Sequence, residues 1–182
     1  WFIETLRREL AEGRNVLVFL WHKELAARLR LLCADAGVDD AVVLDANKVP
    51  ARKRQDWIDK YVVSQRKRVL ITNPTCVQTG LNNLIHFSTA VFFENPGCSP
   101  FVARQAVGRL DRITQTKEVR IYWPVYAGVQ CALLDLLQNK TAISQQIDGI
   151  DPTAALEMAG GGEATAQSLD VGMAVYKYLG GD

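Results

Sequence analysis

Residues 105–112, QAVGRLDR, place one glutamine and two arginines at regular spacing. Gln105, Arg109 and Arg112 are separated by four and then three residues, and a helix brings positions with these spacings to one face. Guanidinium groups suit the geometry of phosphate oxygens. The spacing therefore predicts a helix over 100–113 whose polar face is directed at a polyanion.

A second group of cations lies in the segment DANKVPARKR, at 45–54. This segment follows a predicted strand, and a proline at its centre opens the next predicted helix. Backbone amides at a helix start, together with nearby cations, can hold the phosphates of a nucleic-acid backbone. The predicted phosphate contacts are Lys48, Arg52, Lys53 and Arg54. A solvated, charged helix face explains the same four residues almost as well.

The charge of the chain is nearly balanced, but it is unevenly distributed. The 182 residues carry a net charge of +1 and are 48% hydrophobic, which is typical of one globular domain with a sizeable core. Residues 1–120 contain 19 Lys and Arg against 13 Asp and Glu, whereas residues 121–182 contain 2 against 7. We therefore expect any polyanion to bind to the first two-thirds of the chain.

Several classes of protein are excluded or disfavoured by what the sequence lacks. The four cysteines form no CxxC pair and show no metal-ligand spacing, so no metal site is predicted. There is no membrane-spanning run and no signal-peptide pattern. No GxxxxGK[ST] phosphate-binding loop or acidic magnesium motif occurs, which disfavours a free-standing nucleotide enzyme. We expect a cytoplasmic protein and a chain that is part of a longer one.

The elements predicted to position these residues alternate between strands and helices. Strands are expected at 15–20, 42–44, 68–71, 90–94 and 118–126, and helices at 1–12, 23–34, 50–63, 100–113 and 127–147. Most strands are apolar throughout, which indicates burial on both faces. The pattern predicts a three-layer α/β fold with a mainly parallel sheet flanked by helices. Inward-facing helical positions are expected at Leu25, Leu29, Leu32, Trp57, Ile58 and Tyr61.

Four segments of the sequence, taken in chain order, together resemble the C-terminal RecA-like domain of superfamily 2 helicases. They are NVLVFLWHKELAARL, VVLDANKVPARKRQDWI, RVLITNPTCVQTGLNNL and ARQAVGRLDRITQTKEVRIYWPVY. The nearest branch is the Swi/Snf-type DNA translocases, whose last motif has the form QAxxRxxRIGQ. The similarity covers roughly residues 12–145. It implies a RecA-like domain over 1–147 and a peripheral extension over 148–182.

The resemblance also assigns roles to individual residues. In motif VI it implies that Arg112 is an arginine finger, that Arg109 is its companion, and that Gln105 orders Arg109 or the attacking water. In motif V it implies nucleotide contacts by Gly80 and Asn82 and nucleic-acid contacts by Thr72 or Thr79, alongside Lys48, Arg52 and Arg54 of the basic segment. Motif V here, TNPTCVQTGLNNL, departs from the usual STRAGGxGINL, and Thr114 replaces a glycine of motif VI. Within the resemblance, these departures imply a divergent branch that is encoded by a bacterium, a phage or a mobile element.

Two functions from different classes follow. The first is the C-terminal half of an ATP-dependent DNA translocase or helicase, with DNA, expected as a duplex, as partner. ATP and Mg²⁺ would then be held mainly by an N-terminal RecA-like domain of the same parent chain. The second is a non-catalytic α/β module that binds nucleic acid or protein, in which Arg109 and Arg112 pair with Asp111 or Glu118. His22 is expected to be a strand-end residue whose ring is satisfied by backbone groups.

Overall fold

The computed structural model describes residues 1–77, 81, 83–94, 100–126 and 128–147. The chain divides into two compact units, of which the first comprises Trp1–Pro96 and Val102–Pro124. The second comprises Gly97–Phe101 and Val125–Asp182. The extension predicted for 148–182 lies outside the described residues. The domain boundary expected at residue 147 therefore stays a prediction.

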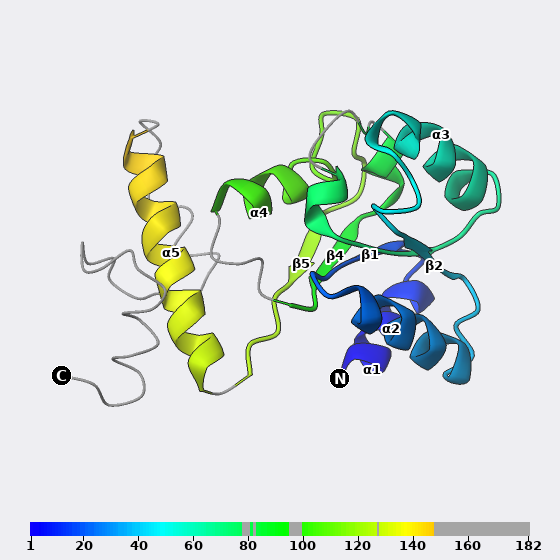
Figure 1. Cartoon of the computed structure of the whole chain (residues 1–182), viewed down its shortest axis with the longest axis horizontal. Helices are drawn as coiled ribbons and strands as arrows, with labels where there is room; N and C mark the ends of the chain where they lie inside the picture. The colour runs from blue at the N-terminus through cyan, green and yellow to red at the C-terminus, as the bar shows by residue number, and fades with distance from the viewer. Residues whose placement is uncertain (78–80, 82, 95–99, 127, 148–182) are drawn as a thin grey trace. The chain divides into compact units, whose positions relative to one another are not determined.

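A five-stranded parallel sheet forms the centre of the first unit (Figure 1). Its strands follow the order β2-β3-β1-β4-β5, and all neighbouring strands in this sheet pair in parallel. The bounds are Val16–Phe19 for β1, Ala41–Leu44 for β2, Val69–Thr72 for β3, Thr89–Phe92 for β4 and Arg120–Tyr122 for β5. All residues of β1, β3 and β4 are buried, because these strands are covered on both faces. The predicted α/β fold with a parallel sheet is confirmed.

Two helices cover one face of the sheet: α1 (Phe2–Ala11) and α2 (Lys23–Asp35) (Figure 1). The buried stripe of α2 consists of Ala26, Leu29 and Cys33, which share one core cluster with Phe2 and Leu6 of α1. Within the predicted stripe, Leu29 is buried and Leu25 is half-buried, but Leu32 is 46% exposed, so the prediction is partly wrong. The helix is rotated so that the positions at 26, 29 and 33 face the sheet.

The opposite face is covered by a segment that changes its helical form twice. It consists of a 3₁₀ turn η1 (Ala51–Lys53), the α-helix α3 (Arg54–Ile58) and the π-helical turn η2 (Asp59–Val63). The continuous helix predicted over 50–63 is therefore wrong in its detail. Trp57 packs against the core and Ile58 is fully buried, but Tyr61 is 38% exposed and does not face inward as predicted.

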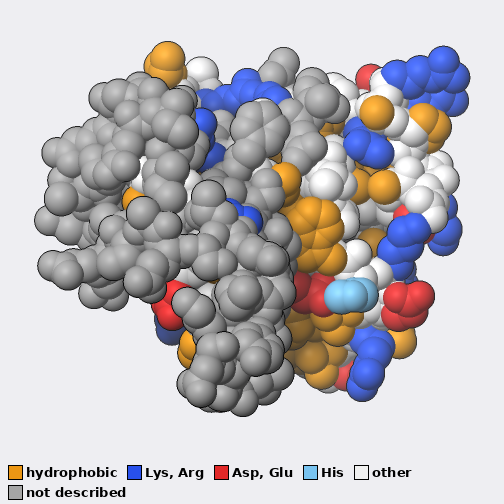
Figure 2. Space-filling model, turned by 60° about the vertical axis from the view of Figure 1, so that its left-hand side comes forward, with side chains coloured by type: hydrophobic (Ala, Val, Ile, Leu, Met, Phe, Trp, Pro, Cys, Tyr) orange, Lys and Arg blue, Asp and Glu red, His pale blue; other side chains and the backbone are white. Residues whose placement is uncertain are grey.

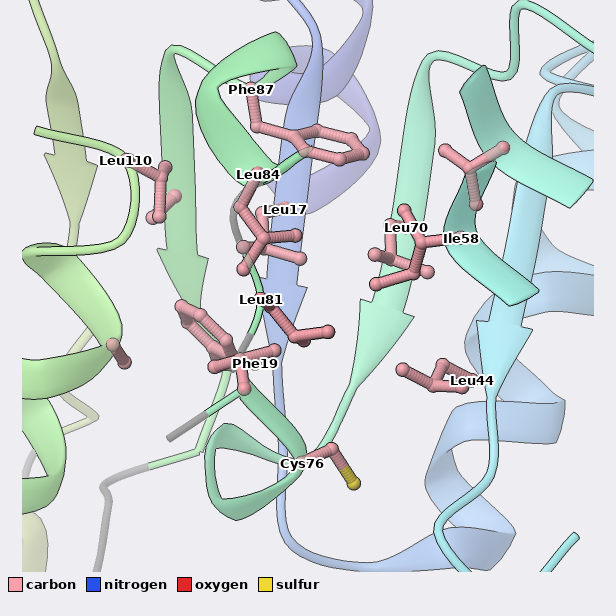
Figure 3. Close-up of a cluster of buried hydrophobic side chains, with 14 of the residues drawn as sticks. Leu17, Phe19, Leu44, Ile58, Leu70, Cys76, Leu81, Leu84, Phe87 and Leu110 are labelled. Carbon is pink, nitrogen blue, oxygen red and sulfur yellow. The ribbon is translucent and has the colours of Figure 1, made fainter. Parts of the chain in front are cut away.

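The core on this second face brings together strands and connecting turns. Figure 3 shows Leu17 and Phe19 of β1 beside Leu70 of β3 and Leu110 from beyond α4 (Pro100–Val107). Two short turns, η3 (Pro74–Val77) and η4 (Asn83–His86), add further apolar side chains to this cluster. The loops that carry the predicted motifs are therefore anchored by buried side chains next to the sheet.

The main described element of the second unit is the helix α5 (Val129–Ile147). Among its side chains that the structure describes, Leu136, Leu137 and Ala142 are buried. Its extent agrees with the helix predicted over 127–147. Among the residues that the structure describes, no helix is both long enough and apolar enough to cross a bilayer.

Candidate phosphate and nucleic-acid interface

The predicted binding segments leave the sheet at one edge. Residues 20–22 follow β1, residues 45–48 follow β2, residues 73–75 follow β3, and Glu94 lies two residues after β4. Parallel strands all end at the same edge, and ligands of open α/β sheets bind outside these carboxyl ends. The structure thus places the described parts of the predicted binding loops at the same edge of the sheet.

The arginines of QAVGRLDR do not share a helix face. The helix α4 ends at Val107, so Gln105 lies on the helix, whereas Arg109 is in the following turn and Arg112 is beyond it. The helix predicted to continue to residue 113 is therefore wrong. The chain instead turns through i→i+3 backbone hydrogen bonds, such as the one from the N–H of Leu110 to the carbonyl of residue 107 (2.9 Å).

The turn nevertheless brings the predicted motif VI against the predicted motif V. The Nη2 atom of Arg112 lies 3.5 Å from the carbonyl oxygen of Leu81, which is 31 residues earlier in the chain. Arg109, Arg112 and Gln105 are all half-buried. The contact between these two segments comes from tertiary folding, because the helical spacing used to predict a shared face does not apply to them.

Gln115 holds this turn in place, a role that the residue spacing did not indicate. Its Nε2 donates to the carbonyl oxygens of Ile85 (3.0 Å), Phe87 (3.1 Å) and Leu110 (3.2 Å). Its Oε1 accepts from the backbone N–H of Lys117 (3.1 Å). The side chain thus joins the segment carrying Arg112 to the segment between η4 and β4. The available signal was the glutamine that closes the motif QAVGRLDRITQ.

The cationic side chains of the basic segment are either exposed or hydrogen-bonded to backbone carbonyl groups. Arg54 is half-buried, and its guanidinium donates to the carbonyl oxygens of Val49 and Cys76, both at 3.2 Å. Lys48, Arg52 and Lys53 are exposed. Arg54 therefore ties η3 to the segment that follows β2, while the other three predicted contacts are presented to solvent.

Of the residues predicted to act in motif V, the structure describes Thr72 alone. Thr72 is 1% exposed, and its hydroxyl donates to the carbonyl of Leu44 (3.1 Å), so it links β3 to the neighbouring β2. In this conformation the Thr72 hydroxyl is not presented to a nucleic acid. Thr79, Gly80 and Asn82 lie outside the described residues, and their predicted roles stay predictions.

Glu94 joins the end of β4 to the start of α2. Its Oε2 accepts from the backbone N–H groups of Trp21 (2.6 Å) and His22 (2.9 Å), and its Oε1 contacts Nδ1 of His22. The expectation that backbone groups satisfy the His22 ring is wrong, because a carboxylate reaches it from the adjacent strand. Since 72 residues separate the two, no local pattern indicates the pair.

This pair shifts the pKa values of both partners. The hydrogen bond and the negative charge of Glu94 raise the pKa of the His22 imidazole. Burial acts to raise the pKa of the Glu94 carboxyl, but hydrogen bonds from His22 and Trp21 outweigh burial and lower that pKa. The His22 side chain is 75% exposed, so its protonation responds directly to the pH of the solvent.

We expect NMR titration of the His22 ring to give a midpoint above about 6.5, the ordinary value for histidine. Glu94→Gln should bring the midpoint back toward that value, because glutamine retains an acceptor for the backbone N–H groups but carries no charge. The stabilising contribution of the pair is complete between the ordinary pKa values of glutamate, about 4.3, and histidine, about 6.5. It is lost as the pH rises through the raised pKa of His22 and as the pH falls through the lowered pKa of Glu94.

Glu24→Gln is the matched control for this titration, because Glu24 makes the smallest contribution to the raised pKa of His22. The control should preserve most of the shift. A His22 midpoint that is the same in the wild type and in Glu94→Gln would contradict the observed contact.

The described residues contain no group of three or more His, Cys, Asp or Glu side chains arranged to hold a metal ion. Cys33 and Cys76 are buried free thiols, and Cys131 is an exposed one. Burial raises the pKa of the Cys33 thiol to about 11, so it remains protonated near neutral pH. Cys98 lies outside the described residues.

Comparison with known proteins adds information about the fold. No family model matches the sequence, and no curated protein matches it. The structure is similar to a solved one described as "Crystal structure of the C-terminal part of Fun30 ATPase domain", with a TM-score of 0.68 and 17% sequence identity. The chain has a RecA-like α/β fold. The match covers 98% of this chain and 51% of the other, so this chain spans about half the length of that structure.

Proposed function

We propose that this chain is the C-terminal half of an ATP-dependent DNA translocase or helicase. It supplies arginines to a composite ATP site and part of a nucleic-acid track. The contact of Arg112 with Leu81 carries the proposal, because it joins the two segments that resemble helicase motifs V and VI. The likeness of the fold to part of an ATPase domain is consistent with this function.

The chemical role proposed for the arginines is electrostatic. Negative charge on the oxygens of a transferred phosphoryl group is stabilised by guanidinium groups held in a fixed position. Here the Gln115 hydrogen bonds fix the turn that carries Arg112. Because the sequence contains no phosphate-binding loop or acidic magnesium motif, ATP and Mg²⁺ would bind mainly to a second RecA-like domain. We therefore expect this chain alone to be inactive as an ATPase.

The nucleic-acid track is proposed to include the exposed cations of the basic segment. Lys48 and Arg52 follow β2, near the carboxyl edge of the sheet. Among the described residues on the face shown in Figure 2, Lys and Arg side chains lie among acidic and hydrophobic ones and form no continuous basic surface. The described part of this face therefore favours a few defined phosphate contacts over a broad electrostatic attraction.

The salt dependence of DNA binding tests this track. In Lys48→Gln/Arg52→Gln, the slope of log K against log salt should become shallower by about 0.9 for each lost phosphate contact. The affinity should fall by similar amounts for unrelated duplex sequences, because phosphate contacts read no sequence. The measurement is fluorescence anisotropy of a labelled duplex between low and moderate salt.

Arg66→Gln provides the matched control. Arg66 is also exposed, but it lies just before β3, at the amino edge of the sheet. Its substitution should leave the slope unchanged. If the double variant and the control have the same slope as the wild type, Lys48 and Arg52 belong to a solvated face and the proposed track is wrong.

A further inference from the structure

A cavity of about 500 Å³ opens at the carboxyl edge of the sheet, between the start of α2 and the ends of β2 and β3. Small-molecule sites typically have volumes of about 300–1,000 Å³. The cavity lies entirely within the first compact unit. Neither the residue spacing nor the helicase resemblance indicated this cavity.

The inner lining of the cavity is apolar. Leu20, Ala26 and Leu44 contribute to it and are each at most 5% exposed, so their side chains also belong to the sheet core. The other apolar residues of the lining are Trp21, Ala27, Leu31, Val43 and Ala46. Among them, Leu31 is 60% exposed. An apolar lining that remains open to water favours a ligand with a flat or apolar portion.

The polar lining is dominated by cations. Lys23, Arg30 and Lys48 contribute to it, and all three are exposed. Within the part of the chain that the structure describes, none of the three forms an ion pair. The one carboxylate in the lining, Asp45, accepts the backbone N–H of Asn47 (2.9 Å) and is thus engaged within its own turn. The cavity therefore combines an apolar interior with a positively charged rim.

We propose that this cavity binds one unpaired nucleotide of a DNA strand, with the base against the apolar lining and the phosphate at Lys23, Arg30 and Lys48. The inference rests on the proposed function and specifies the form of nucleic acid that occupies the track. A paired base is stacked inside the duplex and cannot reach the apolar lining. A single strand presents its bases freely, so it needs none of the unpairing energy that a duplex requires.

Fluorescence of 2-aminopurine within an oligonucleotide tests the proposal, because the signal of this base analogue reports loss of stacking on its neighbours. The probes are a single strand, the same sequence as a blunt duplex, and free dAMP. We expect the single strand to change its fluorescence on binding and to bind more tightly than dAMP, since neighbouring phosphates add contacts. The duplex should give a much smaller signal.

Ala27→Phe fills the cavity without disturbing the core, because Ala27 lies in the lining but is exposed on α2. This variant should weaken single-strand binding on the order of ten-fold, in the range of one lost base contact, and remove the fluorescence change. Ala34→Phe is the control, since Ala34 is exposed on the same helix outside the cavity. Equal melting temperatures of the two variants show that folding is preserved.

The outcomes separate this proposal from the proposed function. Equal loss of single-strand and duplex affinity in Ala27→Phe, or no loss of either, overturns the nucleotide site. Binding of dAMP as tight as that of the oligonucleotide overturns the assignment to a strand and indicates a free-nucleotide site. If the duplex binds with the salt slope set by Lys48 and Arg52, the proposed track stands even when the nucleotide site fails.

Discussion

Arg112→Ala is expected to lower the ATP turnover of the full-length protein that contains this chain by about 10³-fold, the low end of what an arginine finger contributes. Nucleotide binding should change little, because the guanidinium acts mainly on charge that develops in the transition state. Turnover measured with saturating DNA and ATP, together with the affinity for ATP, separates the two effects.

Two further variants sharpen the test of Arg112. Arg112→Lys retains the charge but loses the planar fork, so it should restore only part of the turnover. Arg28→Ala removes an exposed guanidinium from α2 and should leave turnover unchanged. If Arg112→Ala turns over ATP at the wild-type rate, Arg112 is not part of the ATP site. That result would favour the non-catalytic binding module.

Glu9→Ala is expected to destabilise the fold by roughly 3–5 kcal/mol, the usual cost of breaking a buried ion pair from one side. The Glu9 carboxylate is fully buried and receives hydrogen bonds from the hydroxyls of Tyr122 (2.7 Å) and Thr89 (2.8 Å). It also lies 3.1 Å from Nε of Arg14, whose side chain is 8% exposed, and 3.3 Å from Nη1 of Arg120. Removing it leaves Arg14 without its carboxylate partner.

The same network predicts that the free energy of unfolding decreases at acidic pH. Burial acts to raise the pKa of the Glu9 carboxyl, but hydrogen bonds from Tyr122 and Thr89 and the charge of Arg120 outweigh burial and lower it. The stabilisation is therefore present above the ordinary pKa of a glutamate, about 4.3, and is lost as the pH falls through the lowered value. Urea unfolding of the wild type and Glu9→Ala at several pH values measures both effects.

Glu4→Ala is the control for this network. Glu4 lies on the same helix, but its side chain is 85% exposed, so the interactions of its carboxylate at the surface contribute little. We expect the free energy of unfolding to change by less than about 1 kcal/mol. If Glu9→Ala is no more destabilising than Glu4→Ala, the buried network does not hold α1 to the sheet.

The strands and the layer order were predictable because their pattern is local. NVLVFL, RVLI and AVFFE are apolar except for one terminal residue each, and the strands β1, β3 and β4 match these runs to within two residues. Strands buried on both faces need such runs, and strands that alternate with helices favour parallel pairing. The helix of QAVGRLDR was less predictable. Its spacing fits a helix face, but the chain leaves the helix at Val107, well before Arg112.

By itself, the sequence determined the α/β class, the parallel sheet and the presence of motif-like segments beside it. Tertiary structure decided which of their side chains meet. Glu94 contacts His22, which lies 72 residues earlier in the chain, and Arg112 contacts Leu81, 31 residues earlier. Gln115 donates a hydrogen bond to the carbonyl oxygen of Ile85, 30 residues earlier. Local periodicity describes neighbours within a few residues, whereas these contacts depend on strand order and on where each loop returns to the sheet.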